Sequence, residues 1–571
     1  MICEIDFPDV DGGRWRARFA HSHRVLIAHE LGDVEQVIAH AEQAALDGQW
    51  VVGFVSYEAA AAFDPALKTH SAKENLPLAA FAVYGYDEAA LEDISARSAI
   101  SAAWALLDSE AIIAGNIDAA RAAIDRGDYY QVNYATRLQA TLDCDIAALY
   151  AALRAAQPNG YCACIDGGDW QIASVSPELF FDWTPNRTLT TKPMKGTAAL
   201  DAAAVLSDSA KERAENLMIV DLLRNDMARV AETGSVQVVS LFDIEALPSV
   251  LQMTSTIRCV TKVETTLPDI FRALFPCGSV TGAPKVAAMQ AIKSLETSPR
   301  GIYCGAIGVI RPGGHATFNV AIRSVQVDAK NKIALCGIGS GITSDSNARD
   351  EFAEWLVKRR FLLRATASFE LIETLRLESG AYWLLAGHMQ RLLRSAEYFG
   401  FACDPDAVQQ ALNQHASKNQ RGAWRVRLQL ARDGKVTIES FTLAPNPGVV
   451  KVSLAQSAVD SGSEFLRHKT TDRSLYAPHL PMVDGVFDTL LFNEHDEITE
   501  FTRGNVIVEL DGLRVTPPLS CGLLPGVMRA AKLASGEISE AVVLRSDLPR
   551  VSGLWFVNSV RGRIPARLHE C

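Results

Sequence analysis

The middle of the chain contains three glycine-bearing stretches, Lys192-Pro-Met-Lys-Gly-Thr197, Gly278-Ser-Val-Thr-Gly-Ala-Pro-Lys285 and Cys336-Gly-Ile-Gly-Ser-Gly341. The second is not a Walker A loop, because the spacing to Lys285 is wrong and no Ser or Thr follows that lysine. The third follows an expected strand, 332–335, and precedes a helical stretch, but it lacks the spacing of a dinucleotide-binding turn. Each alone fits an ordinary tight turn, so the fold depends on all three and on their surroundings.

The segments around these stretches predict a large α+β body. From 129 to 345, β-rich runs alternate with glycine-punctuated turns, and 210–230 and 284–295 have helical periodicity. A further helix is expected after Ser344-Asp345-Ser346, which are good N-cap residues, with an apolar stripe that extends to about Arg364.

The pattern restarts after this helix. Residues 368–383 predict two strands joined by a turn, and a helix is expected from His388 to Phe399, before Gly400. We therefore predict one domain over 1–366, with an N-terminal part at 1–115 and a core at 116–366, and a second domain over 367–571. No Pro-rich or Ser-rich linker separates them.

Composition limits the classes of function. The 571 residues are 48% hydrophobic and 21% charged, which is typical of a globular chain with several cores. The net charge of −12 argues against nucleic acid as a partner, and an anionic substrate would need local Lys, Arg or metal ions. The N-terminus lacks the features of a signal peptide and no run is long enough for a membrane span, which predicts a cytoplasmic protein without a membrane partner.

Two carboxylates on different expected helices could share a cation. Glu215 lies beside an apolar stripe, and Glu351, Glu354 and Lys358 share one face of the later helix. Mg²⁺ usually takes one or two protein carboxylates and leaves positions for an anionic substrate. The alternative is a solvated helix face with an ion pair between Glu354 and Lys358, which spacing alone favours.

Seven ordered motifs together resemble the chorismate-utilising family of anthranilate, aminodeoxychorismate, isochorismate and salicylate synthases. They are Gln131-Val-Asn-Tyr134, Ser176-Pro-Glu178, Pro193-Met-Lys-Gly-Thr197, Glu215 to Asp226, Gly278 to Lys285, Phe318-Asn-Val-Ala-Ile-Arg323 and Gly337 to Glu354. The resemblance implies antiparallel sheets sandwiched with helices, chorismate as substrate, and Mg²⁺ held by Glu215 and Glu354. The residues it implies for the other contacts with the substrate are Arg323, Tyr303, Gly339, Gly341, Ser279 and Lys358.

Lys195 separates members of this family. Anthranilate synthases typically carry Ala at this position, whereas aminodeoxychorismate synthase component I carries Lys. The resemblance implies that Lys195 attacks ring carbon C2 so that ammonia can enter at C4, and that Glu178 is the general acid/base. A neighbouring cation and Arg323 would depress the pKa of the lysine. An anthranilate synthase-type domain remains the alternative.

Ammonia for such a reaction needs a source. The chain contains no second Cys/His/Glu unit that would release ammonia from glutamine, and Cys277 is better interpreted as a packed thiol. The resemblance therefore implies a separate glutamine amidotransferase subunit. The sequence makes no prediction of the oligomeric state.

A second ordered set of motifs, over 368–571, resembles fold-type IV pyridoxal-phosphate enzymes, a group with an α+β fold. It comprises Ile372-Glu-Thr-Leu-Arg376, His388-Met-Gln-Arg-Leu392, His468-Lys-Thr-Thr-Asp-Arg473, Ile498-Thr-Glu500 with Asn505, and Gly522-Leu-Leu-Pro-Gly-Val-Met-Arg529. By position, Lys469 is the Schiff-base lysine and Glu500 would bond the pyridine nitrogen. The phosphate would lie at Arg391 and at the helix start formed by Gly526, Val527 and Met528.

The two resemblances together imply two successive reactions. The expected product of the first, 4-amino-4-deoxychorismate, is the substrate of aminodeoxychorismate lyase, which belongs to the second group. We therefore expect a bifunctional enzyme that makes 4-aminobenzoate for folate. A branched-chain or D-amino acid aminotransferase-type second domain remains open, because the motifs fix the cofactor rather than the reaction. A regulatory protein with decayed sites is the alternative of another class.

Overall fold

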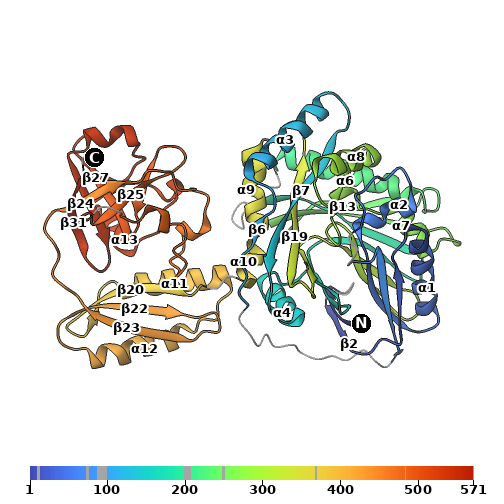
Figure 1. The fold of residues 1–571 in the computed structure, drawn as a ribbon, viewed down its shortest axis with the longest axis horizontal. Coiled ribbons are helices and arrows are strands. Elements are labelled where there is room, and N and C mark those ends of the chain that lie inside the picture. Colours follow the sequence, from blue (N-terminus) through green and yellow to red (C-terminus); the bar gives the residue numbers. More distant parts are fainter. Residues whose placement is uncertain are drawn as a thin grey trace. The chain divides into compact units, whose positions relative to one another are not determined.

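The structure is a computed structural model that describes residues 1–8, 13–72, 76–86, 100–198, 208–246, 251–366, 369–481 and 484–569. It divides into two compact units, Met1–Ala367 and Ser368–Cys571 (Figure 1). The sequence placed the boundary near 366, and residues 367 and 368 lie outside the described ranges. Each unit is described by itself below.

The first unit contains a nine-stranded antiparallel sheet. Its strands, in spatial order, are β15 (Gly282–Ala283), β7 (Gln131–Thr141), β19 (Ile333–Ile342), β18 (Ser324–Asp328), β9 (Trp170–Ser176), β8 (Tyr161–Asp166), β1 (Ile2–Pro8) and β2 (Arg14–Phe19), with β6 (Ala105–Leu106) beside β7. β18 pairs with only the first part of β19, from Ile333 to Cys336. Past Cys336, β19 therefore pairs with β7 but not with β18.

A ten-stranded antiparallel sheet lies in the same unit. Its order is β12 (Met194–Ala198), β14 (Leu251–Val260), β11 (Thr188–Lys192), β10 (Leu179–Trp183), β17 (Ala316–Val320), β16 (Ala306–Ile310), β4 (Trp50–Val55), β5 (Ala79–Tyr84) and β3 (Arg24–Ala28), with β13 (Gln237–Ala246) beside β14. One hydrophobic core contains side chains from both sheets, among them Ile5 of β1 and Phe54 of β4. The two sheets therefore pack face to face.

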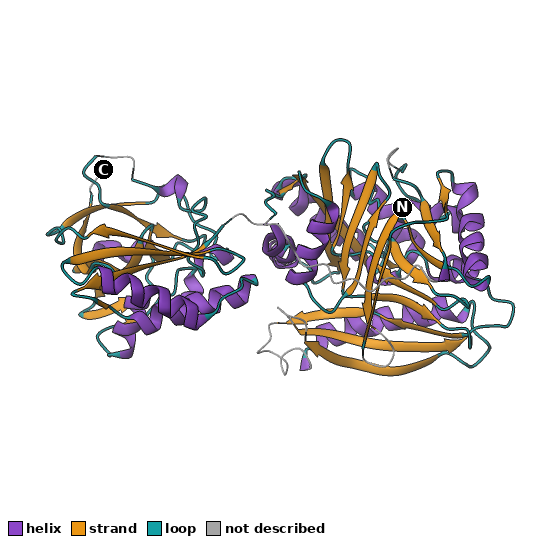
Figure 2. Cartoon of the chain, turned by 90° about the horizontal axis from the view of Figure 1, so that it is seen from below, coloured by secondary structure: helices purple, strands orange, loops and turns teal. Residues whose placement is uncertain are grey.

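Helices cover the outer faces of this sandwich (Figure 2). The ten-stranded sheet is covered by α1 (Val34–Leu46), α6 (Ala210–Ala228) and α7 (Leu267–Leu274), and the short α2 (Ala60–Phe63) joins the same core. The nine-stranded sheet is covered by α3 (Glu110–Asp125), α4 (Ile146–Ala156), α8 (Lys285–Leu295), α9 (Ala348–Lys358) and α10 (Arg360–Thr366). The expected α+β class with sandwiched antiparallel sheets is confirmed.

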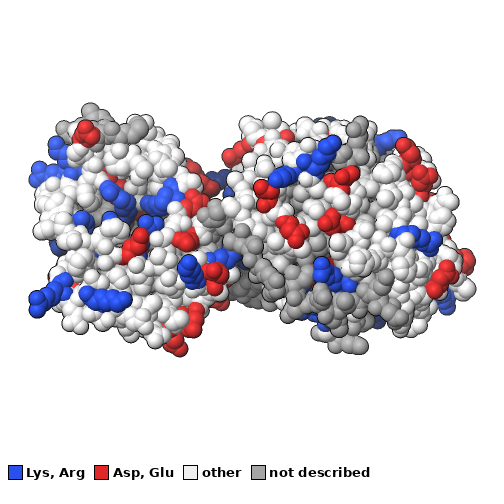
Figure 3. All heavy atoms as spheres, turned by 60° about the horizontal axis from the view of Figure 1, so that its bottom comes forward, with Lys and Arg blue, Asp and Glu red and all other residues white. Residues whose placement is uncertain are grey.

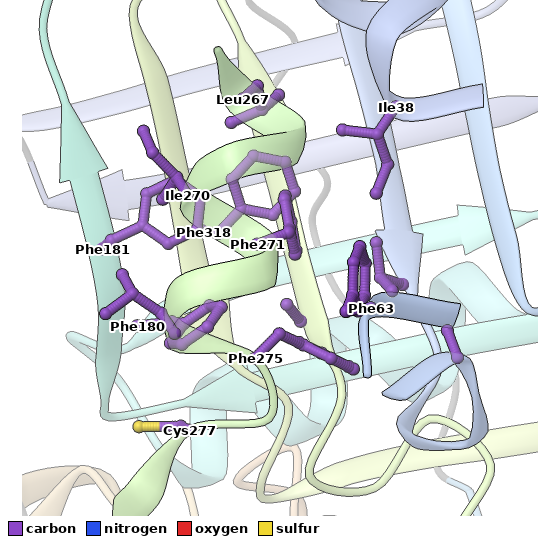
Figure 4. Packing of buried hydrophobic residues seen from close by; sticks show 14 of the residues in the cluster. Ile38, Phe63, Phe180, Phe181, Leu267, Ile270, Phe271, Phe275, Cys277 and Phe318 are labelled. Carbon is purple, nitrogen blue, oxygen red and sulfur yellow. The ribbon is translucent and has the colours of Figure 1, made fainter. Parts of the chain in front are cut away.

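An aromatic cluster connects α7 to the start of β10 (Figure 4). Thr266 caps α7 in a capping box with Asp269, which fixes where the helix begins. The ring of Phe271 packs 6.2 Å from Phe180 and 5.5 Å from Phe181, centroid to centroid. Each such pair contributes about 0.5–1.5 kcal/mol beyond burial. This packing holds the start of β10 and the segment after α7 in place, and both carry residues of the candidate site.

The second unit combines a small sheet with a barrel. The four-stranded sheet has the order β21 (Ala381–Tyr382), β20 (Leu371–Glu378), β22 (Ala423–Leu430) and β23 (Val436–Thr442), and it packs with α11 (Leu385–Phe399) and α12 (Pro405–Lys418). The larger sheet has the order β26 (Ile498–Phe501), β25 (Asp488–Phe492), β24 (Val450–Leu454), β31 (Gly562–Leu568), β30 (Gly553–Asn558), β27 (Gly504–Leu510), β28 (Leu513–Thr516) and β29 (Ser539–Glu540). Because β26 also pairs with β27, six strands close into a barrel, and α13 (Val527–Ala534) contacts it at β30.

Two local predictions were wrong. The helix expected after Ser344-Asp345-Ser346 is capped by Asn347, and it is divided at Arg359 into α9 and α10. The glycines of Cys336–Gly341 form no turn, because they lie inside β19. A side chain at Gly337 would collide with the ring of Tyr303, with its Cβ 2.1 Å from the nearest ring atom. Position 337 therefore requires glycine, because the strand packs closely against the ring of Tyr303 there.

Candidate active sites

The first unit contains a cavity of about 470 Å³. Glu178 lies between β9 and β10, and Arg323 lies between β17 and β18; in both cases the two strands belong to different sheets. The chain crosses from one sheet to the other at both residues. The residues predicted for this site that line the cavity are Glu178, Lys195, Glu215, Ser279, Tyr303, Arg323, Gly339, Gly341, Glu354 and Lys358.

Lys195 extends from β12 into this cavity toward Glu215 of α6. Its Nζ atom lies 3.1 Å from Glu215 Oε2. Burial lowers the pKa of Lys195, but the carboxylates of Glu215 and Glu354 more than offset this effect, so the pKa is raised overall. The predicted depression of the pKa assumed a cation beside the lysine, and it stays a prediction for the site with Mg²⁺ bound. Gly341 makes room for the lysine, since a Cβ there would lie 2.7 Å from Nζ.

Glu178 is fully enclosed beside Ser279. The Ser279 hydroxyl donates a hydrogen bond of 2.7 Å to Glu178 Oε1. Burial raises the pKa of Glu178 to about 7, although the bond from Ser279 and the positive charges of Lys195 and Lys358 lower it. A carboxyl group with this pKa exchanges protons near neutrality, as a general acid/base requires.

The two carboxylates expected to hold Mg²⁺ both face Lys195. Glu354 Oε1 lies 2.6 Å from Lys358 Nζ, so the ion pair of the alternative interpretation is present. Lys358 also donates to the carbonyl of Gly339, which ties α9 to β19. Among the described residues, no group of three or more His, Cys, Asp or Glu could hold a metal ion. Two carboxylates that line one cavity fit the small number of protein ligands that Mg²⁺ takes.

Arginine and tyrosine side chains occupy another part of the cavity. Arg323 has a positive φ of 50° and donates through Nη1 to Gln157 Oε1. Burial and the nearby Arg364 lower the pKa of Arg323 to about 10, so the group stays cationic at neutral pH. Tyr303 packs under the guanidinium groups of Arg137 and Arg300. Arg137 and Arg300 are both paired with Glu296, so Arg323, which lines the cavity, is the group here that suits a carboxylate of a substrate.

The sequence motifs contain residues of this site for which no role was predicted. Gln131, the first residue of β7, is fully buried, and neither atom of its amide has a hydrogen-bond partner. A Cβ at Gly341 would lie 2.2 Å from Gln131 Nε2, so this amide is beside Lys195. Asn216 of α6 donates to the carbonyl of Lys195 and accepts a 2.6 Å bond from Ser255. Membership of a quoted motif was the only available signal for Gln131.

The second unit contains a cavity of about 370 Å³. All six residues predicted for it line this cavity: Arg391, Lys469, Glu500, Gly526, Val527 and Met528. The segment of Lys469 is held against β20, because the Ile372 amide donates to the carbonyl of Lys469 at 3.0 Å. Burial lowers the pKa of Lys469 to about 8, and the positive charges of Arg391 and Arg473 add to this effect.

Glu500 lies on β26 in a network that fixes both of its oxygens. Tyr476 donates its hydroxyl to Oε1 at 2.9 Å, and Asn505 donates its amide to Oε2 at 3.2 Å. Burial raises the pKa of Glu500 to about 8, while the bond from Tyr476 lowers it. A cation beside Glu500, such as a protonated pyridine nitrogen, would favour the carboxylate form. No role was predicted for Tyr476, which lies outside the quoted motifs.

The predicted site for the cofactor phosphate lies at the start of α13, beside Arg391. Arg391 of α11 makes two hydrogen bonds to Glu373, of 2.8 and 2.6 Å, and one to the carbonyl of Pro525. The charges of Arg391 and His388 overcome burial and lower the pKa of Glu373 to about 2. The first amides of α13, from Val527 and Met528, have no partner within the helix. These donors, with Lys469 and Glu500, fit the phosphate, the aldehyde and the pyridine nitrogen of pyridoxal phosphate.

Among the described helices, none combines the length and the apolar character needed to cross a bilayer.

Comparison with known proteins finds a family match in each unit. Residues 105–364 match the chorismate binding enzyme family, and residues 370–568 match the amino-transferase class IV family. The second match supports pyridoxal phosphate as a cofactor.

Aminodeoxychorismate synthase component 1 of Escherichia coli (strain K12) is 39% identical over 246 residues, which are 42% of this chain and 54% of that protein. This chain spans about half the length of the curated relatives that it matches, between 36% and 54% in three of them.

Two solved structures are similar to parts of the chain. The menaquinone-specific isochorismate synthase of Escherichia coli shares the fold, with 18% identity, a TM-score of 0.50, and coverage of 63% of this chain and 88% of that chain. A Mesorhizobium loti protein provisionally named an amino-acid aminotransferase is 40% identical, with a TM-score of 0.34 and coverage of 35% of this chain and 100% of that chain. The chain therefore joins a domain of the chorismate binding enzyme family to a domain of the amino-transferase class IV family.

Proposed function

We propose that the chain makes 4-aminobenzoate from chorismate in two steps, one in each unit. The domain at 1–366 replaces the C4 hydroxyl of chorismate with an amino group. The domain at 367–571 then removes pyruvate from 4-amino-4-deoxychorismate. The observation that carries the proposal is the lysine at position 195, which extends into the first cavity beside Glu215 and opposite Glu354.

In the first step, Lys195 is the nucleophile. Its Nζ atom forms a bond to C2 of chorismate, the two conjugated ring double bonds each shift by one position, and the C4–O bond breaks. Glu178 donates the proton with which the hydroxyl leaves as water. Ammonia then bonds to C4 and gives up a proton to Glu178, both double bonds shift back, and the C2–N bond breaks to release Lys195 as the amine. Because the pKa of Lys195 is raised, the ammonium must lose a proton before it attacks.

Charge neutralisation is the second requirement of this step, because chorismate is a dianion. Glu215 and Glu354 would hold Mg²⁺, and the ion would supply positive charge for one substrate carboxylate. Arg323 lies in the same cavity and suits the other carboxylate. Ser279 keeps the Glu178 carboxyl in one orientation through its hydrogen bond.

In the second step, Lys469 transfers the proton. Pyridoxal phosphate, when bound, supplies an electron sink conjugated to the substrate amine. Lys469 takes the proton from C4, the bond from C3 to the enolpyruvyl oxygen breaks, and the ring becomes aromatic. A proton returned to the methylene carbon completes pyruvate. Burial and neighbouring arginines lower the pKa of Lys469 to about 8, which suits a group that both takes and returns a proton near neutral pH.

Ammonia would come from a separate glutamine amidotransferase subunit. The proteins named component 1 support this partner, since that name implies a second component. In cells the product would serve folate synthesis in the cytoplasm.

Product analysis tests the proposal. The purified chain is incubated with chorismate, Mg²⁺, ammonium and pyridoxal phosphate, and the aromatic product is identified by chromatography. We expect 4-aminobenzoate and pyruvate in equal amounts. Anthranilate would instead assign the first unit to anthranilate synthesis. A requirement for a 2-oxo acid would assign the second unit to amino transfer. A chain that turns over no substrate and binds neither chorismate nor pyridoxal phosphate would be a regulatory protein with decayed sites.

A further inference from the structure

The second cavity contains far more positive than negative charge. Its charged lining residues are Arg391, Arg425, Lys469, Arg473, Glu500, Arg503 and Arg561. Two of these arginines are already neutralised, since Arg391 binds Glu373 and Arg503 lies 3.2 Å from Asp488. In the part of the chain that the structure describes, Arg425, Arg473 and Arg561 have no carboxylate partner. Several basic side chains also gather on one face of this unit in Figure 3.

Arg473 is the inner member of this group of three. Its guanidinium carbon lies 3.9 Å from the ring centre of Tyr476, the residue that binds Glu500. It donates one hydrogen bond, to the carbonyl of Thr502. Its charge acts on both Lys469 and Glu500. Arg473 therefore lies close to the reacting centre with most of its donors free for a ligand.

Arg425 and Arg561 are more accessible. Arg425, on β22, is exposed and stacks over Phe441 at 4.8 Å. Arg561, in the turn between β30 and β31, makes two long hydrogen bonds of 3.4 Å, to Ala444 and Asn446. The rings of Phe487 and Phe556 also line the cavity and pack 5.1 Å apart. The lining of the cavity thus combines two aromatic rings with three guanidinium groups that have no carboxylate partner among the described residues.

We propose that these three arginines make the second cavity selective for a cyclic dicarboxylate, with Arg473 binding the carboxylate nearer the reacting amine and Arg425 with Arg561 binding the farther one. This rests on the proposed function for the identity of the natural substrate. An amino acid with a single carboxylate would leave one end of the arginine set without a counter-charge. The set thus disfavours ordinary amino-acid substrates.

The shape of 4-amino-4-deoxychorismate matches this arrangement. Its enolpyruvyl carboxylate is attached through oxygen at C3, next to the amine-bearing C4. Its other carboxylate is at C1, across the ring from the amine. When the amine faces Lys469, the first carboxylate is near Arg473 and the second points toward the outer arginines. The ring between them contacts the wall of Phe487 and Phe556.

Two stable probes separate the inner and outer contacts. The dianion 3-(carboxymethoxy)benzoate carries both carboxylates, whereas 3-methoxybenzoate keeps only the ring carboxylate. Binding to the full chain loaded with pyridoxal phosphate is followed by the visible absorbance of the cofactor, without Mg²⁺, so that only the second cavity reports. We expect the dianion to bind about tenfold or more tightly than the monoanion, since a hydrogen-bonded charge pair contributes on this scale.

The variants then assign each carboxylate. Arg473→Gln should weaken binding of the dianion about tenfold and change binding of the monoanion less than about twofold. Arg473→Lys should recover part of the lost affinity. Arg425→Gln and Arg561→Gln should weaken both probes. Arg550→Gln is the matched control, because Arg550 is an exposed arginine paired with Asp511 outside the cavity. Equal losses for both probes in Arg473→Gln, or unchanged binding in Arg561→Gln, would overturn the proposal.

These results are independent of the proposed reaction. If the probes follow the expected pattern while the chain transfers amino groups, the dicarboxylate site stands and the lyase function fails. If 4-aminobenzoate forms but all three glutamine variants bind both probes as the wild type does, the lyase function stands and the dicarboxylate site fails.

Discussion

A half-buried lysine lines the cavity of each unit, Lys195 in the first and Lys469 in the second, and the surroundings shift their pKa values in opposite directions. Glu215 and Glu354 raise the pKa of Lys195 in spite of burial. Burial, Arg391 and Arg473 lower the pKa of Lys469 to about 8. Burial alone therefore does not decide how a lysine titrates. The sign depends on which charges the fold brings to it.

This difference corresponds to two kinds of chemistry. A lysine between carboxylates stays protonated until a bound cation and substrate change the net charge around it. Such a lysine becomes a nucleophile only when Mg²⁺ and chorismate are bound. A lysine surrounded by arginines is partly neutral near pH 8 and is ready to exchange protons. The predictions below test whether the two lysines have these separate roles.

The largest effect is expected from Lys195→Ala. This change should reduce 4-aminobenzoate formation from chorismate by about 10³-fold or more, because the nucleophile is lost. Supplied 4-amino-4-deoxychorismate should still be converted, since Lys469 is intact. Lys192→Ala is the control, because Lys192 lies on β11, outside the cavity, and pairs with Glu245 of β13. Product assays that find near-normal turnover of chorismate by Lys195→Ala would remove the lysine from the mechanism.

The second prediction concerns the acid beside Lys195. Glu178→Gln should slow the first step by about 10²-fold, because the leaving hydroxyl loses its proton donor. The donor must be protonated, and its pKa is about 7, so the wild-type rate should fall as the pH rises through 7. In Ser279→Ala the fall should move to higher pH, because the bond from Ser279 lowers the pKa of Glu178. A pH–rate profile without this displacement would contradict the assignment.

The third prediction tests the carboxylate pair. Glu215→Gln or Glu354→Gln should weaken Mg²⁺ and chorismate binding together, each by about tenfold, because ion and substrate neutralise each other's charge. Calorimetric titration of chorismate at several Mg²⁺ concentrations measures this coupling. Glu232→Gln is the control, since Glu232 pairs with Arg187 outside the cavity. If the Mg²⁺ dependence of chorismate binding is unchanged in both variants, Glu215 and Glu354 form structural ion pairs and do not bind Mg²⁺.

The smallest effect is expected in the second unit. Tyr476→Phe removes a hydrogen bond to Glu500 that lowers the pKa of that carboxyl. The pKa of Glu500 should rise, and the second step should slow by about three- to tenfold at neutral pH, since such a bond contributes about 1 kcal/mol. The first step should not change. Turnover of 4-amino-4-deoxychorismate at the wild-type rate would show that Glu500 needs no support from Tyr476.

Much of this fold follows from sequence patterns. The expected helix 210–230 corresponds to α6, which begins after the N-cap Ser209. The helix expected before Gly400 corresponds to α11, because strong periodicity and a left-handed glycine cap mark it. The division between α9 and α10 was missed, since buried apolar residues continue across it, from Trp355 to Phe361. A pattern of this kind cannot distinguish one helix from two.

The sequence was enough to predict which residues line each candidate site. It was not enough to predict which charged and polar groups surround them. Every residue predicted for each site lines the expected cavity. The effect of Glu215 and Glu354 on the pKa of Lys195 was not predicted, because these carboxylates come from two helices that meet only in the fold. The buried amide of Gln131 beside Gly341 was missed for the same reason, since a strand residue gives no sign of what faces it across the sheet.

In the proposed function, the two lysines act one after the other on one substrate. Lys469→Ala is incubated with chorismate, Mg²⁺ and ammonium, and the products are identified by mass spectrometry. We expect 4-amino-4-deoxychorismate to accumulate with neither pyruvate nor 4-aminobenzoate, and later addition of Lys195→Ala protein with pyridoxal phosphate to release both. Formation of anthranilate, or of 4-aminobenzoate at the wild-type rate by Lys469→Ala alone, would contradict it.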